Sequence, residues 1–472
     1  MRSTFCPVFI SIVMAGGNCL VAQPTPEAVA AAMKKAATYY HDRLALRGGY
    51  VYYYSPDLRK RLAEGPATPS QICVQPPATP TVGMAYLAAF KATGDVYYQR
   101  AAQETAHALV YGQLKSGGWT QVIDFDSANR AAGLYRNGKG NRRGKNNSSF
   151  DDGQSQSAMQ FLIHCDEALG FKDERIHEAS KYALEALLQA QFPNGGFPQV
   201  WTGPVARQKI VSASYPSYDW RTQGKVKDYW NRYTLNDGVA GYVLPVLIDA
   251  HRVYRDERFA AAMRRLGDFL VLAQMPDPQP AWAQQYGYDM HPIWARRFEP
   301  PAVSGGESQD VMEVLMETHR QTGDAKYLQP IPRALAYLKR SRLPDGRLAR
   351  YYELRNNRPL YMTRRPGTKD YRLTNSDSNL PSHYGWKIAS RLDAIEREFN
   401  VLKNGGGGKE RKIADSTVAR IVSELDTQGR WVSRYSNQRL VGQPKFRRGE
   451  RFVASGVFSE NLTTLADWLG SR

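Results

Sequence analysis

Segments with a helical spacing of apolar residues alternate along this chain with short glycine turns, and this alternation most limits how the chain can fold. The helical period occurs in eight segments: 83–93, 97–115, 155–169, 176–191, 236–255, 257–273, 308–321 and 326–341. Thr25-Pro26-Glu27-Ala28 opens a further helix with a capping residue, a proline and an acidic first turn. Strand patterns are few and short. The sequence therefore predicts an all-α protein and disfavours a β-helix or a β-sandwich.

A weak internal repeat indicates how these helices are arranged. SGGWTQ at 116–121 follows one helix and NGGFPQ at 194–199 follows another, while PDGR at 344–347 and TQGR at 427–430 stand at comparable helix ends. Glycine supplies the positive φ that the end of a helix often requires. The order of helix, glycine turn, aromatic segment and next helix is typical of stacked helical repeats. We therefore expect an α/α toroid, an incomplete barrel of helical hairpins whose long loops line a cleft.

The charge balance and the first residues restrict the partners and the compartment. The 63 Lys and Arg outnumber the 45 Asp and Glu and give a net charge of +18, which favours a polyanionic partner. Arg2, an apolar centre and a small residue near position 22 predict a signal peptide over residues 1–22. No later apolar run approaches membrane-spanning length. We expect a secreted or periplasmic monomer with no membrane or nucleic-acid partner.

The chain divides at a glycine-rich stretch. We expect the toroid over residues 23–403, and a linker with a C-terminal helical extension that docks on the main domain over 404–472, with helices at 413–425 and 459–469. Two long loops, 126–149 and 202–230, interrupt the helices, and loops of this length are usually functional or mobile. Cys73 and Cys165 are the cysteines beyond the signal peptide; they form one disulfide or remain free thiols.

Four acidic residues are candidates for chemistry. Asp151, Asp152 and Asp237 stand at helix starts, where a carboxylate commonly caps the helix, and Glu299 lies in a loop that ends in two prolines. If the fold brings them together, they can hold a calcium ion through oxygen ligands, or act as the acid and base of a glycosidase. Their spacing alone does not decide between these roles. The histidines show no zinc-binding spacing.

The stretch ARYYELRNNRPLYMTRRP at 349–366 is the densest group of arginines and tyrosines in the chain. Guanidinium groups bind carboxylates through two parallel hydrogen bonds, and aromatic faces beside them offer flat surfaces to sugar rings. A solvated basic surface is the ordinary explanation of such a stretch. The alternative explanation, which the arginine and tyrosine content favours, is a binding site for an anionic ligand.

Taken in order, several motifs resemble one family. SGGW at 116–119, NGGFPQ at 194–199, WARRFEPP at 294–301 with SGGES at 304–308, and ARYYE at 349–353 are similar to the pectate lyases of polysaccharide lyase family 10. The resemblance runs from about residue 30 to Trp386. A single Gly-Gly-aromatic motif is common, but the ordered set is much more specific.

The resemblance implies an α/α toroid that cleaves polygalacturonate (pectate) by β-elimination with the help of Ca²⁺. Position by position, Asp151 and Asp237 match the calcium-site aspartates, with Asp152 as an alternative to Asp151. Arg296 and Arg350 match substrate-binding arginines, and Arg364 matches the arginine that removes the C5 proton. Glu299 and Arg358 complete the substrate-binding residues that we expect. Arg365, Arg358 and the calcium ion would disfavour the positive charge of Arg364, so we expect an alkaline rate optimum.

The chain departs from the family pattern at two places. Arg364-Arg365-Pro366 replaces the usual Arg-Asp-Gly, which removes an acid that would orient the arginine. Asp151-Asp152-Gly153-Gln154-Ser155 also differs from the usual first aspartate motif. Two alternatives therefore remain: a lyase or an inverting hydrolase acting on another uronate polymer, and a non-catalytic protein that binds acidic polysaccharide.

Overall fold

The computed structural model describes residues 23–365, 367–368, 370–406 and 412–472. The expected signal peptide, 1–22, and part of the expected linker lie outside these residues. Twelve α-helices fall within the described part of the chain. They are α1 (Pro26–Tyr39), α2 (Thr79–Thr93), α3 (Val96–Gly112), α4 (Gln154–Ala168), α5 (Glu174–Gln189), α6 (Val239–Tyr254), α7 (Glu257–Leu272), α8 (Gly305–Thr322), α9 (Ile331–Arg340), α10 (Leu392–Lys403), α11 (Asp415–Ser423) and α12 (Ser455–Gly470).

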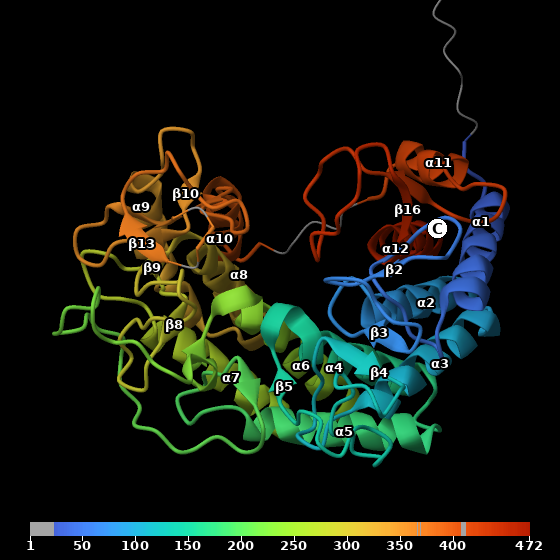
Figure 1. Ribbon diagram of the computed structural model, residues 1–472, viewed down its shortest axis with the longest axis horizontal. Helices are drawn as coiled ribbons and strands as arrows, with labels where there is room; N and C mark the ends of the chain where they lie inside the picture. Colours follow the sequence, from blue (N-terminus) through green and yellow to red (C-terminus); the bar gives the residue numbers. More distant parts are fainter. Residues whose placement is uncertain (1–22, 366, 369, 407–411) are drawn as a thin grey trace, which may run out of the picture.

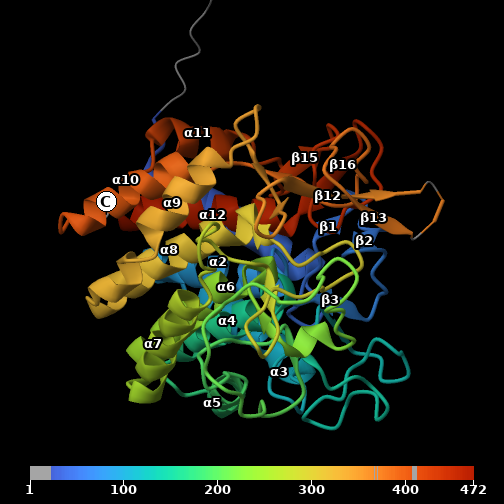
Figure 2. The ribbon, with the colours of Figure 1, turned by 90° about the vertical axis from the view of Figure 1, so that its left-hand side faces the viewer.

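These helices form a ring of hairpins with an inner and an outer layer. The inner helices α12, α2, α4, α6, α8 and α10 contact one another in that order, and the outer helices α1, α3, α5, α7 and α9 pack behind them (Figure 1). In the same view the ring stays open between α10 and the C-terminal helices, and Figure 2 shows the ring from its side. The expected incomplete α/α toroid is confirmed. No helix of the described residues is both long and apolar enough to span a bilayer.

The glycine turns link each outer helix to the next inner helix in a repeated way. Gly117 and Gly195 adopt φ of 99° and 94°, and a Cβ on Gly195 would lie 1.8 Å from the carbonyl oxygen of Arg265. Only glycine fits such a position. Three indoles donate their N–H to a carbonyl of the helix that precedes them: Trp119 to Leu109 at 2.8 Å, Trp282 to Leu270 at 2.7 Å, and Trp431 to Ile421 at 2.8 Å.

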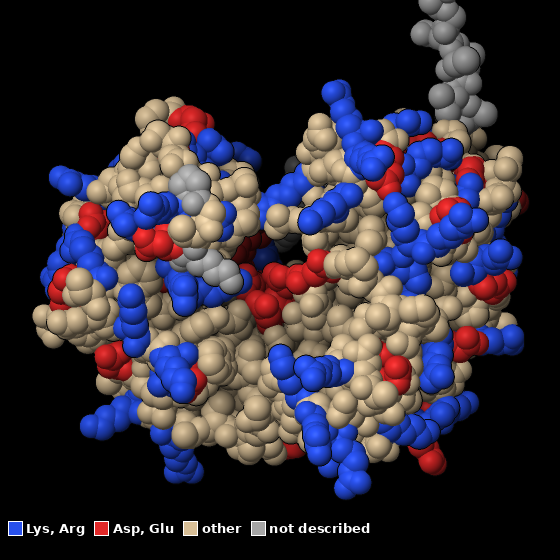
Figure 3. Space-filling model, in the orientation of Figure 1, with Lys and Arg blue, Asp and Glu red and all other residues tan. Residues whose placement is uncertain are grey.

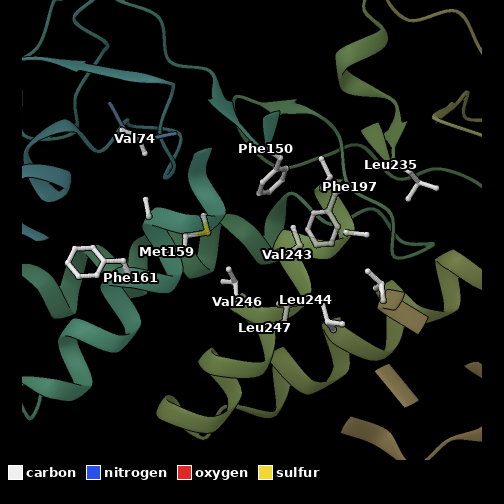
Figure 4. Close-up of a cluster of buried hydrophobic side chains, with 14 of the residues drawn as sticks. Val74, Phe150, Met159, Phe161, Phe197, Leu235, Val243, Leu244, Val246 and Leu247 are labelled. Atoms are coloured by element: carbon white, nitrogen blue, oxygen red, sulfur yellow. The ribbon is translucent and has the colours of Figure 1, made fainter. Parts of the chain in front are cut away.

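The core lies between the two helix layers. Met159 and Phe161 of α4 and the valines and leucines of α6 form part of it, and Phe150 and Phe197 close it from the adjoining loops (Figure 4). Burying each such large side chain contributes roughly 1.5–3 kcal/mol, so the two layers hold each other together. Cys73 and Cys165 are free and buried. The disulfide alternative is therefore wrong, and burial raises the pKa of the Cys73 thiol to about 12.

A small antiparallel sheet interrupts the helices where the sequence is richest in arginine and tyrosine. Its strands are β9 (Val303–Ser304), β11 (Tyr351–Tyr352), β12 (Pro359–Arg364) and β13 (Tyr371–Thr374), in the order β13-β12-β11-β9. Residues 351–364 of the arginine- and tyrosine-rich stretch thus form the β11–β12 hairpin of this sheet. The remaining strands are β1 (Tyr53–Tyr54), β2 (Arg61–Leu62), β3 (Gln71–Cys73), β4 (Val122–Asp124), β5 (Ser148–Ser149), β6 (Val200–Trp201), β7 (Tyr233–Thr234), β8 (Gln285–Tyr286), β10 (Leu348–Ala349), β14 (Lys387–Ile388), β15 (Val432–Arg434) and β16 (Arg451–Ala454).

The C-terminal residues pack against the N-terminal ones. Helix α12 contacts α2 and α1, and β16 pairs with β1 through Tyr53 and Ala454. Helix α12 is therefore an inner helix of the ring. The helices expected at 413–425 and 459–469 correspond to α11 and α12, whereas α10 was not expected. Leu392, Ile395 and Phe399 are buried on one of its faces, a helical spacing that is present in the sequence.

Candidate functional site

Two Asp-Gly pairs at the starts of inner helices place carboxylates at the same mouth of the ring. Asp152-Gly153 precedes α4 and Asp237-Gly238 precedes α6, within the 3₁₀ turns η2 (Asp151–Gly153) and η4 (Asn236–Gly238). Asp152 and Asp237 both adopt a left-handed backbone, with φ of 45° and 53°. Non-glycine residues rarely take this conformation, and it clusters at functional sites. The two turns contact each other, so the side chains converge.

The carboxylates of Asp151 and Asp237 share one amide donor. Gln199 Nε2 donates to Asp151 Oδ1 at 2.8 Å and to Asp237 Oδ2 at 3.3 Å. Burial, followed by the neighbouring Asp151, raises the pKa of Asp237 well above its usual value. Burial also raises the pKa of Asp152 to about 6, with a further contribution from Asp151. The mouth of the ring thus holds three carboxyl groups close together. For Asp152 and Asp237, the nearby positive charges do not fully offset the cost of burial and mutual repulsion.

Arg296 approaches this group from the loop before β9. Its Nε lies 2.9 Å from Glu299 Oε2 and its Nη2 lies 3.5 Å from Asp237 Oδ2. Burial by itself lowers the pKa of Arg296, but Glu299 and Asp237 outweigh it and the pKa lies above its usual value. Arg296 is therefore a permanently charged group beside the carboxylates. Glu299, 1% exposed, holds it in place.

Arg350 lies between β10 and β11 and borders a cavity together with Asp237. Its Nη2 lies 3.2 Å from Glu307 Oε1, and its guanidinium carbon lies 4.6 Å above the ring of Tyr384. Burial alone would lower the pKa of Arg350, but the negative charge of Glu307 and other neighbours outweighs this effect. The pKa lies above its usual value, so this arginine also stays charged. Its Nε is buried without a hydrogen-bond partner among the described residues. The side chain as a whole is 18% exposed, so a ligand can reach its guanidinium only at the exposed edge.

Arg364 differs from these two arginines. It ends β12, pairs across the sheet with Tyr371, and its guanidinium carbon lies 5.8 Å from the Tyr371 ring. Phe298 packs against Tyr371 with ring centroids 5.4 Å apart, and Arg296 lies 5.6 Å from Phe298. Arg364 is exposed, and no carboxylate among the described residues pairs with it. Arg364 therefore lacks the buried acid partner that Arg296 and Arg350 each have.

Arg358 lies apart from the other expected residues. It is exposed in the turn between β11 and β12, at the opposite end of β12 from Arg364. They are six residue steps apart along the strand, which corresponds to about 20 Å at the usual rise of a strand. The structure therefore brings together Asp151, Asp237, Arg296, Glu299 and Arg350. Arg364 is connected to Arg296 through the rings of Tyr371 and Phe298, and Arg358 lies outside the group.

Sequence reasoning missed three residues of the site. Gln199 bridges the two aspartates, and Tyr384 donates its hydroxyl to Glu299 Oε1 at 3.0 Å. Glu307, in the first turn of α8, holds Arg350. Gln199 ends the repeated NGGFPQ motif, which was the available signal for it. For Tyr384 the sequence offered no signal, since its partners come from distant segments.

The site opens into cavities on both sides. A cavity of about 780 Å³ borders Asp151 and Arg296, and one of about 620 Å³ borders Asp152, Asp237 and Arg350. Figure 3 shows Asp and Glu side chains in the central hollow, with Lys and Arg side chains around it. An acidic floor below basic walls suits a cation and a polyanion together.

The donor set at the floor fits a divalent cation. Two adjacent carboxylates that share one amide donor repel each other, and a bound cation would offset that repulsion. In the part of the chain that the structure describes, no cluster of three or more His, Cys, Asp and Glu side chains is arranged to hold a metal ion. Protein ligands at this site would therefore be supplemented by ligand or water oxygens.

The chain matches one protein-family model and is similar to several solved structures. The family model described as pectic acid lyase matches residues 113–348, half of the chain. A mutant family 10 polysaccharide lyase from Cellvibrio cellulosa in complex with trigalaturonic acid is 21% identical, with 69% of this chain and 99% of that chain covered and a TM-score of 0.47. The family 10 polysaccharide lyase from Cellvibrio cellulosa is 21% identical over 68% and 97%, with a TM-score of 0.46. A D-mannose isomerase is 12% identical over 95% and 98%, with a TM-score of 0.48. No curated protein matches this chain significantly.

The toroid, the acidic floor with its charged arginines and the family match together define a polysaccharide lyase. More particularly, the chain belongs to the pectic acid lyase family, as the sequence motifs predicted.

Proposed function

We propose that this chain is an exported pectate lyase that cleaves polygalacturonate by Ca²⁺-assisted β-elimination, with Arg364 as the base. The observation that carries the proposal is the crowded carboxylate pair of Asp151 and Asp237 beside the charged Arg296. An anionic polymer would be repelled by such a pair alone. A cation bound by the pair would offset this repulsion and would account for acids in a basic cleft.

The binding residues have distinct tasks. Asp151 and Asp237 would hold Ca²⁺, with Gln199 keeping the two carboxylates together; the bound ion supplies charge neutralisation for the uronate carboxylate. The side chains of Arg350 and Arg296 are 18% and 38% exposed, so both can bind carboxylates through charge-assisted hydrogen bonds at their exposed edges. Arg358, from its distant turn, would contact only a remote unit of the polymer.

The elimination step needs a base and a stabilised carboxylate. The C5 proton passes to the base, its electron pair forms the C4–C5 double bond, and the C4–O bond breaks; the leaving oxygen takes a proton from water. Arg296 and Arg350 stabilise the negative charge that develops on the carboxylate. Since buried acids keep these two charged, neither can accept the proton. Arg364 has no such acid partner among the described residues, and this supports Arg364 as the base.

The geometry of the carboxylates argues against the hydrolase alternative. An inverting glycosidase separates its two carboxyl groups by about 6.5–9.5 Å to admit a water molecule. Here one oxygen of Asp151 and one of Asp237 both lie within 3.3 Å of the same amide nitrogen. Mass spectrometry of the products tests the choice: elimination gives one fragment that lacks a water relative to the hydrolytic product. Fragments with the full hydrolytic mass would overturn the lyase proposal.

Tyr384 is expected to position both charged arginines. It donates to Glu299, which holds Arg296, and its ring lies under Arg350. Burial, and then Glu299, raises the pKa of Tyr384 well above its usual value, so it keeps its proton at alkaline pH. Tyr384→Phe leaves Glu299 with an unpaired buried oxygen, which costs about 1–3 kcal/mol. We expect kcat/KM on polygalacturonate to fall about tenfold.

Two further variants separate positioning from folding. Tyr384→Leu also removes the ring under Arg350 and should raise KM more than Tyr384→Phe does. Tyr182→Phe, on the outer helix α5, is the matched control and should leave both kinetic constants unchanged. If Tyr384→Phe retained the wild-type kcat and KM, the positioning role would be refuted.

A further inference from the structure

The hairpin of β15 and β16, residues 432–454, is strongly basic, and we call it the basic hairpin. It contains one acid, Glu450, and six cations: Arg434, Arg439, Lys445, Arg447, Arg448 and Arg451. All six cations are exposed, and none forms an ion pair within the residues that the structure describes. Glu450 pairs instead with Lys60, in the turn between β1 and β2, at 3.5 Å. Figure 3 shows Lys and Arg side chains gathered where Figure 1 places β16 and β2.

Two of these arginines stand opposite each other in the sheet. Arg434 of β15 is the direct partner of Arg451 of β16, and side chains of such partners project from the same face. Like charges in this position destabilise a sheet. Arg434 Nη1 donates to the carbonyl oxygen of Gly449 at 3.4 Å, which is a neutral acceptor. The free protein therefore carries a repulsion here that a bound anion would relieve.

The loop between the two strands is held against the body of the protein. Phe446 stacks on Phe452 with ring centroids 4.8 Å apart, and it meets the Tyr53 ring edge-on at 5.7 Å. The Tyr53 hydroxyl donates to the carbonyl oxygen of Val441 at 3.1 Å. The cations of the basic hairpin are therefore presented on a packed loop, and such preorganisation lowers the entropic cost of binding.

The same loop reaches across the opening of the ring to the site. Arg439 Nη1 lies 3.5 Å from the position that a Cβ on Gly385 would occupy. Gly385 directly follows Tyr384, whose ring lies under Arg350. A polymer that is longer than the site can thus continue over the basic hairpin. The family match ends at residue 348 and assigns no role to this hairpin.

We propose that the basic hairpin is a second binding surface for acidic polysaccharide, which holds the part of a long chain that extends out of the site through the ring opening. The inference rests on the proposed function for the identity of the polymer. It deepens that function, because it makes long chains the preferred substrates. Five of the six cations are arginines, which bind carboxylates through two parallel hydrogen bonds.

A double-mutant cycle on Arg434 and Arg451 tests this proposal. Arg434→Glu and Arg451→Glu each convert the like-charged pair into a pair of opposite charges, so each should raise Tm by about 1 °C. Each should also weaken the binding of polygalacturonate about threefold, measured by calorimetry in a chelating buffer. The combined variant again has a like-charged pair, and we expect the wild-type Tm with about tenfold weaker binding. Weaker binding that comes only with a lower Tm would indicate a merely structural role and would overturn the proposal.

The dependence on chain length is the second measurement. In initial rates, the combined variant should lose several-fold of kcat/KM on polygalacturonate relative to kcat/KM on trigalacturonate, because only a long chain can occupy the site and the basic hairpin together. Arg100→Glu combined with Lys172→Glu is the matched control. Both residues are exposed and lie outside the basic hairpin, and the change in net charge is the same.

Three outcomes separate the possibilities. If the combined variant binds polygalacturonate as tightly as the control does and keeps the wild-type ratio of rates, the second binding surface is refuted. Loss of binding to vesicles of anionic phospholipid, with binding of polygalacturonate unchanged, would assign the basic hairpin to a membrane and would also overturn the proposal. If the wild type shows no elimination but its binding of polygalacturonate still depends on Arg434 and Arg451, the second binding surface stands and the proposed function fails.

Discussion

Replacing Arg364 by alanine is expected to lower kcat on polygalacturonate about 10³-fold while changing KM little. Loss of a positioned base typically costs 10²–10⁴-fold in rate. Arg296 and Arg350 cannot take over, because buried carboxylates keep both of them protonated. Arg364→Lys keeps the positive charge but shortens the donor group, and should remain at least 100-fold below the wild type. Stopped assays with excess enzyme would measure these low rates.

The pH profile provides a second test of the same residue. Arginine holds its proton to a pH above about 12, so a rate that depends on its neutral form rises with pH. We expect the rate of the wild type to increase through the alkaline range and the residual rate of Arg364→Ala to lack this increase. Arg347→Ala, an exposed arginine paired with Asp345, is the control and should keep the wild-type profile. A flat or acidic profile in the wild type would contradict Arg364 as the base.

Asp237→Asn is expected to abolish activity and yet stabilise the calcium-free protein. The side chain is 17% exposed, and burial and Asp151 raise the pKa of its carboxyl group. A group with a raised pKa binds more protons in the folded than in the unfolded state, so its contribution to stability is lost as pH rises from about 4 through the folded pKa. At pH 8 without calcium the charge is a net cost. Asparagine also tolerates the left-handed backbone at this position.

Calorimetry in the presence of a chelator measures this second prediction. The Tm of the wild type should fall as pH is raised from 5 to 8, and Asp237→Asn should reduce that fall and raise Tm at pH 8 by about 2 °C. Calcium should raise the Tm of the wild type but not that of the variant. Asp393→Asn, at an exposed ion pair with Arg342, is the control and should still respond to calcium. A calcium response retained by Asp237→Asn would exclude Asp237 as a ligand.

The sequence predicted the ring because its helices carry their own signals. Apolar spacing and glycine turns are local, and they identified the hairpins and the incomplete toroid. Helix α10 was not predicted, although its apolar residues follow the same helical spacing. The information was therefore present in the sequence and was overlooked. The position of α12 against α2 is different, since it depends on contacts between residues more than 350 apart in the chain.

The site was predictable in its residue types but not in its pairings. Motif order indicated Asp151, Asp237, Arg296 and Arg350, which do lie together. The roles of Glu299 as a partner of Arg296 and of Glu307 as a partner of Arg350 arise only from the packing of separate loops. Distance along the chain also misled: Arg358 is near Arg364 in sequence, but an extended strand separates them.

The choice between Asp151 and Asp152 shows the same limit. Both carboxyl groups lie near Asp237, but Asp151 shares Gln199 with it, whereas Asp152 accepts a hydrogen bond from Gln75 at 3.1 Å. Asp152, not Asp151, repeats the left-handed Asp-Gly geometry of Asp237. Sequence alignment alone could not separate two adjacent acids with such different partners.

The central claim, calcium-assisted elimination on polygalacturonate, is tested most directly by ultraviolet absorbance. Elimination creates a double bond conjugated with the carboxylate, and hydrolysis does not. Incubating the chain from Gln23 with polygalacturonate should give an absorbance that rises with time, increases toward alkaline pH and disappears when a chelator removes calcium. Absence of a calcium-sensitive signal at every pH from neutral to alkaline would contradict the account.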